Sequence, residues 1–63
     1  MSKVHYRDLE FNKKYLFQIH ETAVLVTLMK NVSNDYIEFI TDAGDIHYTT
    51  TNEDGYVLRL IKL

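Results

Sequence analysis

Runs of β-branched and aromatic residues alternate with short polar breaks along the chain. The five runs are Tyr15–His20, Ala23–Lys30, Tyr36–Thr41, Ile46–Thr50 and Tyr56–Leu63. Short runs of these residue types between clusters of Asn, Asp and Gly are typical of β-strands. The pattern predicts an all-β fold, in which a small five-stranded antiparallel sheet curls on itself or forms a barrel.

Both glycines of the chain lie in polar breaks. Gly44 belongs to the break Asp42–Asp45, and Gly55 ends the break Thr51–Gly55. Because glycine adopts positive φ at no steric cost, each break is predicted to be a tight turn between antiparallel strands.

The run Ala23–Met29 differs from the others because it is apolar on both of its alternating faces. In Tyr36–Thr41, by contrast, Ile37 and Phe39 form one apolar face and Glu38 lies on the other. A strand that is apolar on both faces is expected to be covered on both sides. A sheet this small must curl on itself or be covered by another element, and a curled barrel is the more economical solution.

The last run, Tyr56–Leu63, places Val57 and Leu60 on opposite faces if it alternates without interruption. A long apolar strand left unpaired at a sheet edge promotes aggregation. We therefore expect this strand to pair within the sheet or across a homo-oligomer interface.

Residues 1–8 are less regular than the rest of the chain. Ser2 is suited to cap a short helical turn, whereas Val4 and Tyr6 fit an extra edge strand. The segment is predicted to be a lid or a flexible extension of a single small β-barrel domain that spans residues 1–63.

The chain has 63 residues and no cysteine, so neither a disulfide nor a thiolate zinc site can supplement its one small core. The N-terminus has no apolar leader, and no stretch approaches the roughly 20 apolar residues of a membrane span. These features predict a cytoplasmic protein without a membrane partner.

The segment Leu9-Glu10-Phe11-Asn12-Lys13-Lys14-Tyr15-Leu16-Phe17, followed by four more strands with tight turns, resembles small SH3-like barrels. The resemblance covers most of the chain and is one of superfold, with no family-specific motif. It implies a curled barrel and no particular activity, because one superfold hosts many functions. Tryptophan is absent, so the proline-binding aromatic cluster of SH3 signalling domains is not matched.

Residues suited to catalysis or metal binding are sparse. His5, His20 and His47 are far apart in the sequence, and no pair has the spacing that places two ligands on one element. No glycine-rich phosphate loop, nucleophile–base pair or cofactor motif is present. We therefore expect a protein that is not an enzyme and that uses no cofactor and no metal.

Charge is distributed unevenly along the chain. Residues 1–20 contain four basic and two acidic residues, whereas residues 21–55 contain one basic and seven acidic residues. Such charges either keep a small domain soluble as solvated loops and strand faces, or form a dipolar surface that selects a partner by charge. The predicted function is the binding or modulation of another protein through an edge strand and an aromatic, acidic patch. By analogy of size alone, an accessory protein of a phage or other mobile element is expected. The predicted binding residues are Tyr36, Glu38, Asp42, Asp45 and Tyr48.

The alternative is a single-stranded nucleic-acid-binding barrel, in which tyrosines stack on bases beside basic residues. Its predicted binding residues are Lys3, Arg7, Lys13, Lys14 and Tyr15. The isoelectric point of about 5.8 weighs against it, because phosphate binding favours a basic surface.

Overall fold

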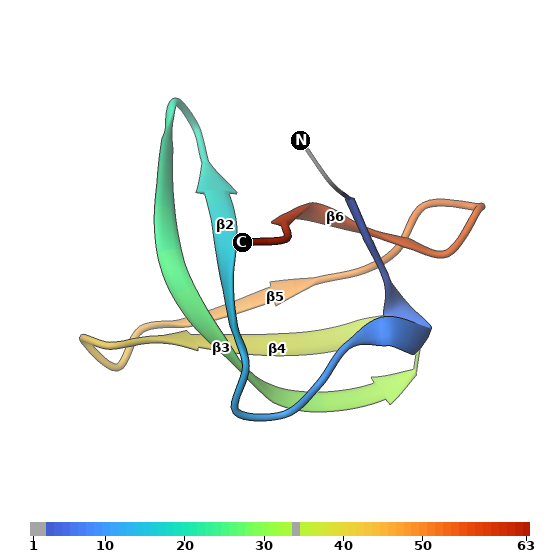
Figure 1. Ribbon diagram of the computed structural model, residues 1–63, viewed down its shortest axis with the longest axis horizontal. Helices are drawn as coiled ribbons and strands as arrows, with labels where there is room; N and C mark the ends of the chain where they lie inside the picture. Colours follow the sequence, from blue (N-terminus) through green and yellow to red (C-terminus); the bar gives the residue numbers. More distant parts are fainter. Residues whose placement is uncertain (1–2, 34) are drawn as a thin grey trace.

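In a computed structural model, which describes residues 3–33 and 35–63, the chain forms one antiparallel sheet (Figure 1). The described strands are β1 (Lys3–His5), β2 (Lys14–Ile19), β3 (Thr22–Ser33), β4 (Tyr36–Thr41), β5 (Ile46–Thr49) and β6 (Tyr56–Ile61). A 3-10 turn, η1 (Tyr6–Asp8), follows β1. The strand order is β1-β6-β2-β3-β4-β5. The predicted all-β, antiparallel class is confirmed.

The N-terminal segment contains both structures that the sequence left open, an edge strand and a helical turn. The Ser2 cap lies outside the described residues. His5 instead precedes the turn, and its Nδ1 accepts a hydrogen bond from the backbone N–H of Arg7 at 3.2 Å.

β3 is the longest strand and bends as it passes from one pairing partner to the other (Figure 1). Its first half pairs with β2, from Thr22 to Thr27, and its second half pairs with β4. The register with β4 shifts between Leu28 and Lys30 and again between Asn31 and Ser33. Such bulges bend a strand, so β3 gives the sheet its curl.

The sheet is curled but not closed. β1 and β5 are its two edges. Past the end of β5, Thr51 forms a single bridge with Val57, and the N–H of Leu58 donates to the carbonyl of Thr50 at 2.9 Å. The structure therefore has the curled-sheet form of the prediction, without barrel closure.

The core lies on the concave face, and every strand except β5 contributes to it. Its buried members are Val4, Tyr15, Phe17, Val26, Leu28, Ile37, Phe39, Val57 and Leu60. The Phe39 ring lies 6.2 Å, centroid to centroid, from both Tyr15 and Phe17. No polar or charged residue is fully buried within the described residues, so core stability comes from apolar and aromatic packing.

The predicted coverage of both faces of Ala23–Met29 is wrong. Val26 and Leu28 are buried, but Leu25 is 43% exposed and Met29 is 46% exposed. The described residues form one sheet, and its concave side holds the core. No second layer from these residues covers the convex face of β3.

The predicted uninterrupted alternation of the last strand is also wrong. Arg59 has a φ of +64°, which breaks the extended conformation in the middle of β6. Val57 and Leu60 consequently face the same core instead of opposite sides. β6 lies between β1 and β2 and pairs with both, as expected for a strand that pairs within the sheet.

Both glycine turns form as predicted. Gly44 has a φ of +92°, and its N–H donates to the carbonyl of Thr41 at 3.0 Å. Gly55 has a φ of +88°, and its N–H donates to the carbonyl of Asn52 at 3.0 Å. No helix in the described part of the chain is both long and apolar enough to cross a membrane.

Candidate functional site

Three of the predicted partner-binding residues meet on the convex face of the β4–β5 hairpin. Because Ile37 and Phe39 point into the core, the alternating side chains Tyr36 and Glu38 point outward. Tyr48 of β5 lies directly opposite Glu38. The hydroxyl of Tyr36 donates a hydrogen bond to Oε2 of Glu38 at 2.5 Å, and the rings of Tyr36 and Tyr48 are 5.7 Å apart. We call these three residues the tyrosine–glutamate cluster.

The hydrogen bond within the cluster strengthens the hold of Tyr36 on its phenolic proton. The hydrogen bond to Glu38, with a further contribution from desolvation, raises the pKa of Tyr36 to about 12. The ammonium of Lys30 lies 6.0 Å from the centroid of the Tyr36 ring, and Lys30 is the strand partner of Glu38. The cluster therefore presents two aromatic rings held in place by a carboxylate and flanked by a cation.

The surface between the cluster and the hairpin tip is apolar. Tyr48 is 60% exposed, and on the same face the exposed Ile46 pairs with the half-buried Ile40. Patches of exposed apolar side chains on small proteins often mark binding surfaces. Tyrosine is well suited to such a surface, because it combines a large rigid ring with a polar tip.

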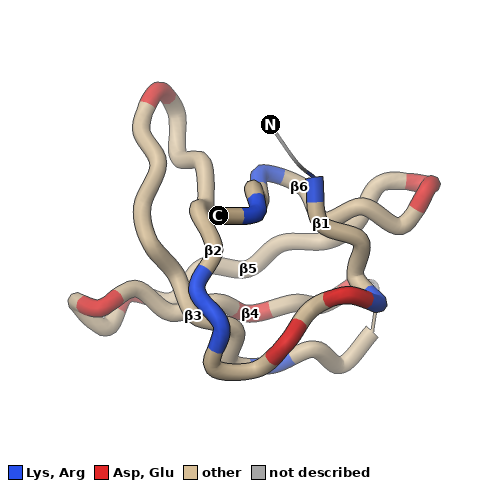
Figure 2. The backbone as a smooth tube through the Cα atoms, in the orientation of Figure 1, with Lys and Arg blue, Asp and Glu red and all other residues tan. Residues whose placement is uncertain are grey.

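The other two predicted residues, Asp42 and Asp45, lie at the tip of the same hairpin (Figure 2). The Ile40–Ile46 pair stands between this tip and the tyrosine–glutamate cluster. Oδ1 of Asp42 forms an ion pair with Nζ of Lys14 at 2.9 Å. The backbone N–H of Asp45 donates to Oγ1 of Thr41 at 3.1 Å, which shapes the turn. The five predicted residues thus share one hairpin but form two groups.

β5 is an edge strand over most of its length. Ile46–Tyr48 pair with β4 on one side, and no other strand of the described residues pairs with their free side. At Thr49 the edge comes close to β6, and the hydroxyl of Thr49 donates a hydrogen bond to the carbonyl of Leu58 at 3.0 Å. The free edge is therefore short and lies directly beside Tyr48.

Leu25 and Met29 are surface residues that the sequence analysis missed. A strand that is apolar on both faces has the same composition whether its second face is covered by the chain or left exposed. No sequence signal separates the two cases here.

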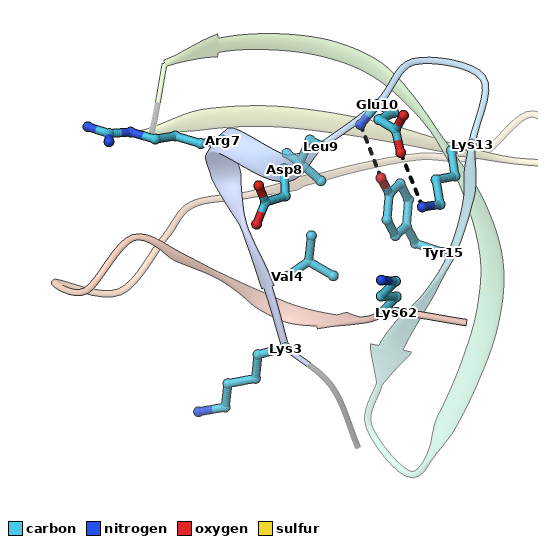
Figure 3. Close-up of a pocket in the computed structure, with 9 residues that line it drawn as sticks. All are labelled: Lys3, Val4, Arg7, Asp8, Leu9, Glu10, Lys13, Tyr15 and Lys62. Atoms are coloured by element: carbon cyan, nitrogen blue, oxygen red, sulfur yellow. Dashed lines mark hydrogen bonds and ion pairs between the residues drawn. The ribbon is translucent and has the colours of Figure 1, made fainter.

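The predicted nucleic-acid-binding residues do not form one exposed basic and aromatic face. Lys14 is engaged by Asp42, and Tyr15 is 1% exposed with its ring in the core. A ring in that position cannot stack on a base, so this part of the alternative prediction is wrong. The remaining three residues, Lys3, Arg7 and Lys13, line a pocket of about 450 Å³ beside Tyr15 (Figure 3).

The pocket has an apolar floor and a charged rim. Val4 and Tyr15 are buried and Leu9 is half-buried. The backbone N–H of Glu10 donates to the hydroxyl of Tyr15 at 3.1 Å, and the carboxylate of Glu10 pairs with Nζ of Lys13 at 3.1 Å.

Arg7 contributes little to the interior of the pocket, because its side chain points away from the other lining residues (Figure 3). Its Nε donates to the hydroxyl of Tyr6 at 3.3 Å, and this bond raises the pKa of Arg7 above its ordinary value.

Two of the three histidines pack in the fold, and the third lies in a turn. His5 stacks on Tyr6 with ring centroids 4.9 Å apart, and His47 stacks on Phe17 at 5.4 Å. His20 occupies the turn between β2 and β3 with a φ of +55°. The described residues contain no group of three or more His, Cys, Asp or Glu side chains positioned to hold a metal ion.

Comparison of the chain with models of protein families, with curated proteins and with solved structures found no match.

Proposed function

We propose that this protein is a non-enzymatic, cytoplasmic module that binds or modulates another protein through the β4–β5 hairpin. The observation that carries the proposal is the exposed tyrosine–glutamate cluster beside the free edge of β5. The partner is an extended segment that adds to β5 as a further strand, with apolar side chains against Tyr48 and Ile46.

The binding energy in this mode comes from two sources. Backbone hydrogen bonds to the edge of β5 align the partner segment, and pockets or rings on alternate positions select its side chains. Tyrosines are enriched among the residues that dominate interface energies. The cluster is held in place before binding by the Tyr36–Glu38 hydrogen bond and the ring contact with Tyr48, which lowers the entropy lost on association.

Charge favours a partner segment that is basic. Glu38 and the tip residues Asp42 and Asp45 place three carboxylates along one hairpin, and within the described residues no cation lies within ion-pair distance of Asp45. A lysine or arginine of the partner near the tip would find an unpaired carboxylate. Rim charges of this kind act mainly on association rate and specificity.

A pair of matched variants tests the proposal. Tyr48 and Phe11 are both 60% exposed aromatic residues, but Phe11 lies in the segment before β2 and is not part of the hairpin. We expect Tyr48→Ala to weaken partner binding by roughly tenfold or more, and Phe11→Ala to change it by less than about twofold. The measurement is affinity capture from the native cell, followed by titration of the captured protein against each variant.

Equal retention of the captured protein by wild type and Tyr48→Ala would overturn the proposed surface. Retardation of single-stranded oligonucleotides at low salt, lost on Lys13→Gln, would favour the nucleic-acid alternative. Sedimentation that reports a dimer abolished by Tyr48→Ala would identify the partner as a second copy of this chain.

A further inference from the structure

A second pocket, beside β6, has two basic residues in its lining and no acidic residue among the described residues that form it. The basic residues are Lys3 of β1 and Arg59 of β6. Figure 2 shows the basic positions of these two paired strands side by side. Within the described part of the chain, no carboxylate lies within ion-pair distance of either residue. Because unpaired charges of one sign around a hollow attract the opposite sign, the pocket favours an anionic ligand.

The side chain of Lys3 belongs to this pocket and not to the one beside Tyr15. Val4 is buried in the core, so alternation along β1 places the side chain of Lys3 on the opposite face. Figure 3 accordingly shows Lys3 extending away from Val4 and Tyr15. In the pairing of β1 with β6, Lys3 lies opposite Ile61, and both residues line the second pocket.

The positive φ of Arg59 brings a guanidinium and an apolar side chain to the surface together. In a regular strand, consecutive side chains point to opposite faces, so either Leu58 or Arg59 would point into the core. Arg59 instead has a φ of +64°, and both side chains are exposed. A guanidinium presents a planar fork of N–H donors, which matches two oxygens of a carboxylate or a phosphate. The irregularity in β6 therefore supplies both a charged and an apolar contact for one ligand.

The apolar surface beside the two cations is accessible. Tyr56 is 39% exposed and Leu58 is 42% exposed, and both line the pocket. The Tyr56 ring packs edge-on against His5, with ring centroids 5.3 Å apart, which holds it in place. The exposed Gln18 adds an uncharged amide donor to the lining. The pocket volume of about 270 Å³ is at the lower end for small-molecule sites, so it suits one ring with one charged group.

We propose that this pocket binds a small aromatic molecule that carries one oxyanion group, a carboxylate or a phosphate. The oxyanion lies between the guanidinium of Arg59 and the ammonium of Lys3, and the ring packs on Leu58 and Tyr56. The fork of Arg59 orients the oxyanion, and Lys3 adds charge. None of the lining residues belongs to β4 or β5, so this site is tested independently of the proposed binding hairpin.

Chemical-shift titration of the full chain with four probes tests the proposal. The probes are phenyl phosphate, phenylacetate, inorganic phosphate and the neutral benzyl alcohol. We expect phenyl phosphate or phenylacetate to shift the amide signals of Gln18, Leu58 and Arg59 at lower concentration than either inorganic phosphate or benzyl alcohol. The aryl anion that binds more tightly identifies the oxyanion class.

Variants with equal loss of charge separate a defined site from general electrostatic attraction. Arg59→Gln should lower the affinity for the better aryl anion by roughly three- to tenfold, and Lys3→Gln by roughly two- to fivefold. Arg7→Gln removes the same charge from a side chain outside this pocket and should lower the affinity by less than about twofold. Unchanged amide signals of the core residues Val26 and Phe39 show that each variant is folded.

Three results would each overturn the proposal. The first is a loss of affinity in Lys3→Gln and Arg59→Gln no larger than that in Arg7→Gln. The second is a set of equal shifts with benzyl alcohol and the aryl anions, and the third is the absence of any shift at the pocket amides with either aryl anion.

Discussion

Gly55 occupies a position that no other residue fits. Its φ of +88° is in the region that L side chains rarely adopt. A Cβ at this position would also overlap Nε2 of His5 and lie 3.0 Å from Cε1 of that ring. The His5 ring has little freedom to withdraw, because it stacks on Tyr6 and packs edge-on against Tyr56.

The two turn glycines provide a matched test of this packing. Gly44→Ala should lower the free energy of unfolding by about 1–2 kcal/mol, because its φ of +92° is strained but nothing lies within 4 Å of the new Cβ. Gly55→Ala should lower it by a further 1–3 kcal/mol or so, because the new methyl overpacks against His5. Urea denaturation of both variants provides the measurement.

A double-mutant cycle identifies the cause of the difference. In a His5→Ala background the cost of Gly55→Ala should fall toward that of Gly44→Ala, because the obstructing ring is gone. An unchanged cost in that background would show that backbone strain, not contact with His5, distinguishes the two turns.

Tyr36 reports on the state of the tyrosine–glutamate cluster through its titration. The hydrogen bond to Glu38 raises the pKa of Tyr36 from 10.0 to about 12. Because the folded pKa lies above the ordinary value, the stabilisation that this bond provides is fully present below pH 10 and is lost as the pH rises through about 12.

We expect the Glu38→Ala variant to return the pKa of Tyr36 toward 10, because the acceptor of the phenol proton is removed. Ultraviolet difference titration against Tyr36→Phe isolates this one tyrosine from the other four. Titration of Tyr36 near pH 10 in the wild-type chain would contradict the hydrogen bond.

At the scale of single elements, the sequence predicts where strands and turns lie but not how they bend. Tyr36–Thr41 and the two glycine turns follow directly from alternation and from the positive φ of glycine. The break in β6 does not follow, because an arginine with positive φ has no sequence signature. The positive φ of Arg59 lets Val57 and Leu60 face the same core, and this packing is visible only in the folded structure.

The sequence also predicts which residues of the candidate site share a face, but not the contacts that they make with distant strands. Alternation places Tyr36 and Glu38 on the outward face of β4, and the turn at Gly44 brings Tyr48 opposite Glu38. The ion pair of Asp42 with Lys14 of β2 could not be predicted, because it joins the hairpin turn to a strand that is not adjacent to β4 in the sheet. The burial of Tyr15, by contrast, follows from alternation, because Tyr15 shares one face of β2 with the buried Phe17.

The stability of the whole molecule depends on one small core, which is enclosed by a sheet with two free edges. Domains of this kind have free energies of unfolding of about 0.05–0.15 kcal/mol per residue, which for 63 residues corresponds to roughly 3–9 kcal/mol. Without disulfides, this stability must come mainly from the buried residues. The loss of a single central ring is therefore comparable with the whole free energy of unfolding.

Phe39 is the residue on which this argument is best tested. It is fully buried and contacts the rings of both Tyr15 and Phe17. Phe39→Ala should lower the free energy of unfolding by about 3–5 kcal/mol and leave much of the chain unfolded at 37 °C. Phe11→Ala, which removes an equally large but exposed ring, should change it by less than about 0.5 kcal/mol.

Thermal unfolding followed by circular dichroism at two protein concentrations separates the outcomes. If Phe39→Ala melted cooperatively near the wild-type temperature at both concentrations, the core would not be the main source of stability. If it did so only at the higher concentration, association between copies would supply the remainder.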